Sequence, residues 1–143
     1  MKTVITYLLA LTLFLAMDLV WLGYVAKDFY LSRMGAIMLD RPKMGIAVLF
    51  YTVYVIGLMV FVITPALAGG NWQTAALNGA LFGFFTYLTY DATAYAVLKN
   101  YDPLVAVIDT AWGSFLAAAV SASTVALIHL FGPCLLYTSP SPR

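Results

Sequence analysis

Apolar residues fall into four long runs along this chain, separated by polar or glycine-containing breaks. The runs cover residues 4–26, 44–68, 74–98 and 104–131. A transmembrane helix needs about 20 apolar residues, so each run is long enough to span a bilayer. The short breaks at 69–71 and 100–103 require antiparallel neighbours. The pattern predicts an all-α fold, an antiparallel integral membrane four-helix bundle with short loops.

The segment between the first two runs, residues 27–43, mixes charged and apolar side chains. Such a mixture is typical of a short helix that lies in the membrane interface. An ordinary solvated loop fits the same residues equally well, so both interpretations stay open.

The two ends of the chain need separate treatment. The first run is too long for the apolar part of a signal peptide, and bulky Phe14 stands where cleavage after Ala16 would need a small residue. We expect it to be retained as a helix. The final letters CLLYTSPSPR resemble a translated sequencing adapter, although a natural flexible Ser/Pro-rich terminus is the alternative. The expected division is a four-helix transmembrane domain at 1–132 and a non-native tail at 133–143.

Composition agrees with a membrane protein and argues against several other classes. Hydrophobic residues make up 64% of the chain and charged residues only 9%, which a water-soluble domain could not bury. A net charge of +1 leaves no basic field for nucleic acid, so we expect the lipid bilayer as partner and no nucleic acid.

The distribution of basic residues predicts the orientation. Five of them fall on one side of the predicted spans and Lys2 falls on the other; the five are Lys27, Arg33, Arg41, Lys43 and Lys99. Because basic residues favour the cytoplasmic side, both termini are expected outside the cytoplasm. We interpret Tyr24, Tyr30 and Trp72 as members of the interfacial aromatic belts.

Three aspartates and one tyrosine lie inside the spans at matched depth. Asp18, Asp91, Asp109 and Tyr51 are each seven to nine residues from a charged residue at the cytoplasmic edge. At about 1.5 Å per helical residue they should form one layer. An acid facing lipid costs roughly 2.5–3.5 kcal/mol, so we expect these side chains to point inward.

Four aromatic residues complete the candidate substrate- or proton-binding set: Tyr87, Tyr90, Trp21 and Trp112. The pattern Asp-x-x-Trp occurs twice, at 18–21 and 109–112. This spacing places each indole beside a carboxylate, where its N–H could donate to an acid on a neighbouring helix. The alternative is a satisfied polar network that only fixes helix register.

Metal and cofactor binding have little support in the sequence. The aspartates could supply oxygen ligands, but the single histidine, His129, lies near the opposite end of the fourth run. The single cysteine, Cys134, falls short of any metal pattern, and nucleotide motifs are missing. We expect no metal and no cofactor.

Small residues recur at four-residue spacing in the third and fourth runs. Gly79 and Gly83 form one pair, and Gly113 and Ala117 form the other. Small side chains let helix backbones approach closely. The pairs favour packing within the bundle, and a homodimer through the same residues is the alternative.

Several segments together resemble a family of uncharacterised bacterial membrane proteins, domain of unknown function 2177. The likeness rests on residues 17–23, 50–51, 79–83, 87–91 and 109–113 and covers nearly the whole chain. The resemblance implies a four-helix protein of the bacterial inner membrane and brings no catalytic residues. Ala92 and Ala94 replace polar residues that often follow the third-helix aspartate in that family.

Three functional classes remain open at this point. A small proton- or cation-coupled transporter would use the acid layer as its binding site. A membrane enzyme acting on lipid would use one aspartate as general acid or base. A structural or accessory subunit would need the layer only for assembly. We favour the transporter.

Overall fold

The computed structural model describes residues 2–34, 43–99 and 101–135, and the part it describes is all-α. Its elements in chain order are α1 (Lys2–Val20), the π-helical turn η1 (Trp21–Val25), α2 (Lys27–Met34), α3 (Met44–Leu58), the π-helical turn η3 (Met59–Ile63), α4 (Thr64–Gly69), α5 (Trp72–Val97) and α6 (Pro103–Leu135). The expected all-α membrane fold is confirmed. Most of the proposed tail, residues 136–143, lies outside the described residues.

Three helical segments among the described residues are long and apolar enough to cross a membrane. They are Thr3–Val25, Met44–Gly69 and Pro103–Phe131. These segments match the first, second and fourth apolar runs. Helix α5 has the necessary length, with 26 residues, but polar side chains such as Asn78 and Asp91 lower its hydropathy. The fourth span therefore stays a prediction.

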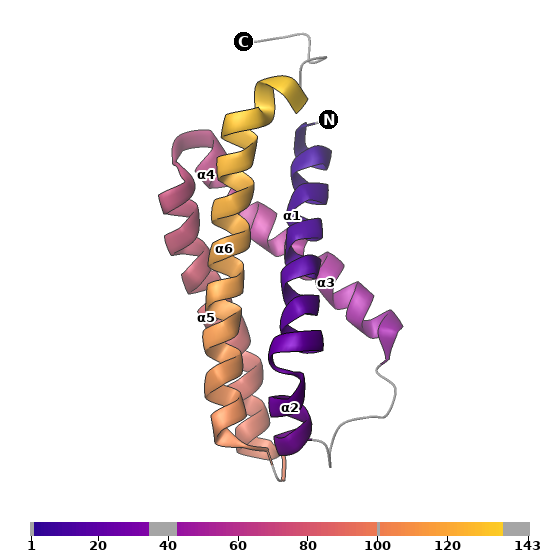
Figure 1. Cartoon of the computed structure of the whole chain (residues 1–143). Coiled ribbons are helices and arrows are strands. Elements are labelled where there is room, and N and C mark those ends of the chain that lie inside the picture. The colour runs from indigo at the N-terminus through magenta and orange to yellow at the C-terminus, as the bar shows by residue number, and fades with distance from the viewer. Residues whose placement is uncertain (1, 35–42, 100, 136–143) are drawn as a thin grey trace.

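Consecutive long helices run in alternating directions. Helices α1, α5 and α6 lie along the length of the molecule, and α3 crosses them obliquely (Figure 1). Helix α1 begins and α6 ends at one end of the molecule, while α2 and the α5–α6 connection lie at the other (Figure 1). The most extensive helix pairing is that of α5 with α6, and α1 packs against both α6 and α3.

Two π-helical turns interrupt the first and second spans. In η1, which contains Gly23, the Ala26 N–H donates to the Trp21 carbonyl at 2.7 Å, and α2 starts immediately afterwards. In η3 the wider turn precedes Pro65, whose missing N–H removes a helical hydrogen bond. Residues 27–34 are therefore helical, and the rest of the expected interfacial segment, 35–42, lies outside the described residues.

The small residues bring α5 and α6 into close contact within one chain. A Cβ on Gly83 would clash with the Gly113 carbonyl oxygen, and a Cβ on Gly79 would lie 2.7 Å from the carbonyl oxygen of Ala117. The ring of Tyr87 covers Gly113. The expected packing within the bundle is confirmed, and association of two copies stays a prediction.

The start of each of these two helices is fixed by a polar side chain. The Asn71 side-chain oxygen accepts from the Thr74 N–H at 2.9 Å and caps α5. Before α6, Asp102 accepts from the Leu104 N–H at 2.8 Å, and Pro103 stands in the first turn. Both caps set where the helices begin and so fix the height of the acids they carry.

Candidate functional site

Asp18, near the end of α1, joins three helices. Its side chain is 5% exposed. It accepts hydrogen bonds from the Tyr51 hydroxyl of α3 and, at 3.1 Å, from the Trp112 Nε1–H of α6. Because donors from two other helices meet on one carboxylate, Asp18 faces the interior of the bundle.

Asp91, on α5, is the most deeply buried of the acids, with 0% of its side chain exposed. Its two oxygens accept hydrogen bonds from the Tyr101 hydroxyl at 2.9 Å and the Thr110 hydroxyl at 3.0 Å. Tyr101 lies in the α5–α6 connection and Thr110 lies in α6, so Asp91 ties α5 to α6 at the site.

Asp109, on α6, is partly buried and lies within hydrogen-bonding reach of Asp91. It also accepts from the Tyr30 hydroxyl of α2 at 2.9 Å. Tyr30 in turn accepts from the Trp21 Nε1–H at 3.1 Å. Asp91 and Asp109 thus form a carboxyl pair, and Asp109 is its more accessible member.

The two indoles act differently from one another. Trp112 donates directly to an acid on a neighbouring helix, as the Asp-x-x-Trp spacing suggested. Trp21 does not: it reaches Asp109 only through the Tyr30 hydroxyl, because η1 turns the chain and inserts α2 between them. The two indole rings stack with centroids 4.4 Å apart and an interplanar angle of 6°.

A cavity of about 440 Å³ lies between these helices. Five of the eight predicted site residues line it: Asp18, Tyr51, Tyr87, Tyr90 and Asp109. Of these, Tyr87 is partly buried, whereas Tyr90 is 61% exposed. Asp91, the other member of the carboxyl pair, does not line this cavity.

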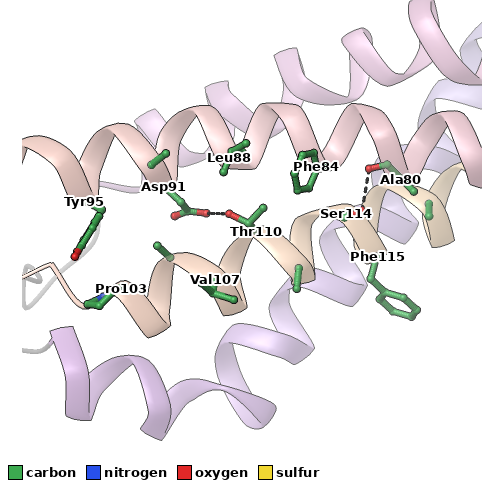
Figure 2. Close-up of a pocket in the computed structure, with 14 residues that line it drawn as sticks. Ala80, Phe84, Leu88, Asp91, Tyr95, Pro103, Val107, Thr110, Ser114 and Phe115 are labelled. Atoms are coloured by element: carbon green, nitrogen blue, oxygen red, sulfur yellow. Dashed lines mark hydrogen bonds between the residues drawn. The ribbon is translucent and has the colours of Figure 1, made fainter.

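Asp91 instead lines a second hollow, an apolar groove of about 840 Å³ between α5 and α6. Figure 2 shows the Asp91 carboxylate pointing from α5 towards Thr110 on α6. Further along the groove, the Ser114 hydroxyl donates to the Ala80 carbonyl at 2.9 Å (Figure 2). The carboxyl pair therefore separates a cavity with acidic and phenolic walls from a groove with mainly apolar walls.

Two tyrosines that the sequence did not assign to the site contact the acids. Tyr30, interpreted above as part of an aromatic belt, is only 8% exposed and donates to Asp109, so that interpretation was wrong. Tyr101, in the α5–α6 connection, is 6% exposed and donates to Asp91. Neither follows a helical spacing from an acid, and no signal in the sequence singled them out.

One ion pair occurs within the described parts of the chain, between Arg33 and Asp102 at 2.8 Å. It joins α2 to the start of α6. The hydrogen bond from Arg33, reinforced by the Leu104 N–H, lowers the pKa of Asp102. Since this is the only such pair there, none of Asp18, Asp91 and Asp109 forms an ion pair with a basic side chain among the described residues.

The tyrosines at the edge of the acid layer respond to burial and to the nearby acids. Burial raises the pKa of Tyr30, and the negative charge of Asp109 raises it further. Burial also raises the pKa of Tyr101, and its hydrogen bond to Asp91 acts in the same direction. Both side chains therefore remain phenols and donors over the neutral pH range.

Metal binding gains no geometric support in the described part of the chain. No group of three His, Cys, Asp or Glu side chains converges there as a metal site would require. The contacts of the acids are hydroxyl and indole donors, together with the carboxyl–carboxyl contact of Asp91 and Asp109.

The fold and this layer define an integral membrane protein with a hydrogen-bonded cluster of acids and aromatic side chains inside its helices. The chain belongs to the family DUF2177, described as a predicted membrane protein, whose family model matches residues 3–126. The comparisons with curated proteins and with solved structures found no match. The family resemblance is thus confirmed, and the function has to be argued from the site.

Proposed function

We propose that this protein is a small proton-coupled carrier in which the Asp91–Asp109 carboxyl pair binds the proton. The observation that carries this proposal is the contact between two carboxyl groups that have no basic partner among the described residues. A hydrogen bond between two carboxyl groups requires a proton on one of them. Two negatively charged carboxylates in contact would repel each other strongly in a medium of low dielectric constant.

The titratable groups around the carboxyl pair are acids and phenols, so a bound proton is the counter-charge that the pair requires. Asp18 on α1 is the other acid that faces the same cavity. The remaining titratable side chains around the layer are phenols, contributed by α2, α3, α5 and the α5–α6 connection: Tyr30, Tyr51, Tyr87, Tyr90 and Tyr101. Neutral phenols donate hydrogen bonds but do not neutralise a carboxylate, so a second negative charge on the pair would be uncompensated.

The cavity beside Asp109 gives the carrier a place for its cargo. Its volume of about 440 Å³ falls in the range of small-molecule sites, which is roughly 300–1,000 Å³. Since Asp109 both lines the cavity and contacts Asp91, a cargo that binds there meets the same carboxyl that holds the proton. This shared residue supplies the coupling between proton and cargo.

The proposed membrane topology places the acid layer on the cytoplasmic side of a bacterial inner membrane. Helix α5 would be the fourth span, because its 26 residues are about 39 Å long and it packs along the membrane-capable α6. Lys27 and Arg33 belong to α2, and Lys99 lies in the α5–α6 connection. These two segments lie at the same end of the molecule (Figure 1). Basic residues favour the cytoplasm, so both termini would be outside it.

A membrane enzyme acting on lipid is the second candidate, and one observation favours it. The apolar α5–α6 groove reaches Asp91, which would then be the general acid or base. However, both oxygens of Asp91 already accept hydrogen bonds from Tyr101 and Thr110. A carboxylate held in this way is better suited to sharing a proton with Asp109 than to reaching a substrate.

Proton uptake by the purified protein tests the proposal. We would step the pH from the mildly alkaline range down to neutral in lipid nanodiscs and count protons with an indicator dye. The wild type should take up about one proton more per chain than Asp109→Asn. The control Asp102→Asn makes the same chemical change on a partly exposed residue before α6 and should match the wild type. Equal uptake by wild type and Asp109→Asn would overturn the proposal.

A further inference from the structure

The walls of the cavity beside Asp109 have an unusual chemistry for a membrane interior. Aromatic rings cover much of them, and two carboxyl groups, Asp18 and Asp109, are their only formally charged side chains. Carboxylates repel phosphate, sulfate and carboxylate groups, and aromatic faces attract cations. The wall chemistry therefore selects a positively charged guest.

The cavity continues into an opening on the side of the bundle. A hollow of about 390 Å³ is lined by Ile46, Phe50, Tyr87, Tyr90 and Asp109, and all of these except Ile46 also line the cavity. Ile46 is 64% exposed and Phe50 is 49% exposed. Helix α3, which carries both, crosses the other helices obliquely (Figure 1). The segment that contains α3, Met44–Gly69, is long and apolar enough to cross a membrane, so the hollow opens beside a candidate span.

We infer that the cargo is a lipophilic organic cation, an ammonium or phosphonium centre bearing hydrocarbon groups, which enters from the bilayer between α3 and α5. This inference rests on the proposed carrier function and names its substrate class. The cationic centre lies against Asp109 with Asp18 nearby, and its hydrocarbon groups contact Phe50, Tyr87 and Tyr90. Binding displaces the proton from the carboxyl pair, so one positive charge enters the site as another leaves.

Other guests fit the same walls less well. A lipid with a phosphate head group would bring its negative charge against two carboxylates. A sugar would leave part of its hydroxyl groups against the apolar Leu22, Phe50 and Val105, and it would bring no positive charge to the two carboxylates. An organic cation satisfies both the carboxylates and the aromatic rings.

Two probes of the same shape and opposite charge test the inference. Tetraphenylphosphonium and tetraphenylborate would be equilibrated with the protein in nanodiscs, and binding would be corrected for partition into protein-free nanodiscs. We expect saturable binding of tetraphenylphosphonium and none of tetraphenylborate. Binding should release protons into a weakly buffered solution and should weaken as the pH falls.

Matched variants locate the binding site. Asp109→Asn should weaken tetraphenylphosphonium binding by about tenfold or more, whereas Asp102→Asn should leave it unchanged. Tyr90 is exposed, so its variants should fold even if Asp109→Asn does not. Tyr90→Leu removes the ring and should bind several-fold more weakly than Tyr90→Phe, which keeps it.

The outcomes separate this inference from the carrier proposal. Normal proton uptake without saturable tetraphenylphosphonium binding would overturn the substrate class and leave the proton site standing. Saturable binding without proton release would support the substrate class and overturn the coupling. Equal binding of tetraphenylborate, or equal binding by the Leu and Phe variants of Tyr90, would contradict the inferred recognition.

Discussion

The indoles of Trp21 and Trp112 stack 4.4 Å apart, although they donate their N–H groups to different parts of the acid layer. Trp112 donates to Asp18, and Trp21 donates to Tyr30, which in turn donates to Asp109. The stack therefore packs η1 against α6 next to the carboxylates. Changes to either indole should affect the layer as well as the packing.

Replacing Trp112 with phenylalanine keeps an aromatic ring and removes the N–H donor to Asp18. Because a buried carboxylate loses one of its donors, the free energy of unfolding should fall by about 1–3 kcal/mol. Denaturant unfolding in one detergent measures this change. Trp72→Phe is the control, since Trp72 is 51% exposed, and an equal loss in both variants would contradict a special role for the Trp112 N–H.

Adding a methyl group at Gly83 should force α5 and α6 apart. The new Cβ would clash with the backbone oxygen of Gly113, which cannot move without shifting the helix. We expect Gly83→Ala to destabilise the protein by about 1–3 kcal/mol or more. Gly45→Ala is the matched control, because nothing lies within 4 Å of its Cβ. Thermal unfolding that is the same for both variants would rule out the tight contact.

Tyr30 should stay protonated above the pH at which a tyrosine ordinarily titrates. Burial and then the charge of Asp109 raise its pKa from 10.0, so its hydrogen bond stabilises the fold below that value and is lost only as the pH rises through the raised pKa. The difference in tyrosinate absorbance between wild type and Tyr30→Phe reports this titration. Asp109→Asn should move it to lower pH, and an unmoved titration would exclude the influence of Asp109.

The Arg33–Asp102 ion pair should give a pH dependence on the acid side. The hydrogen bond from Arg33 lowers the pKa of Asp102 below 3.8, so its stabilising effect is present above that value and is lost as the pH falls through the lowered pKa. Arg33→Gln should flatten the dependence of the unfolding midpoint on pH in this range. A slope equal to that of the wild type would mean that the pair does not form.

Much of the fold could be predicted because long apolar runs have few alternatives inside a membrane. The positions of Asp18 and Tyr51 could also be placed at one depth by counting residues from the charged edge, and in the structure Tyr51 donates to Asp18. Counting works there because both residues lie in regular helix, where each residue adds a constant rise.

The contacts of Tyr30 and Tyr101 could not be predicted in the same way. Tyr30 follows η1, and Tyr101 lies between α5 and α6, so neither keeps a helical register with an acid. Their positions depend on how α2 and the α5–α6 connection pack against the bundle. The oblique course of α3, which leaves Phe50 half exposed, is likewise a tertiary property that a hydrophobic pattern does not encode.

Infrared spectroscopy of the protonated carboxyl band at neutral pH tests most directly whether Asp91 and Asp109 share a proton. We expect a band in the wild type and in Asp102→Asn that is lost or shifted in Asp91→Asn and in Asp109→Asn. A wild-type spectrum without a protonated carboxyl band, or a band that neither variant of the pair alters, would contradict it.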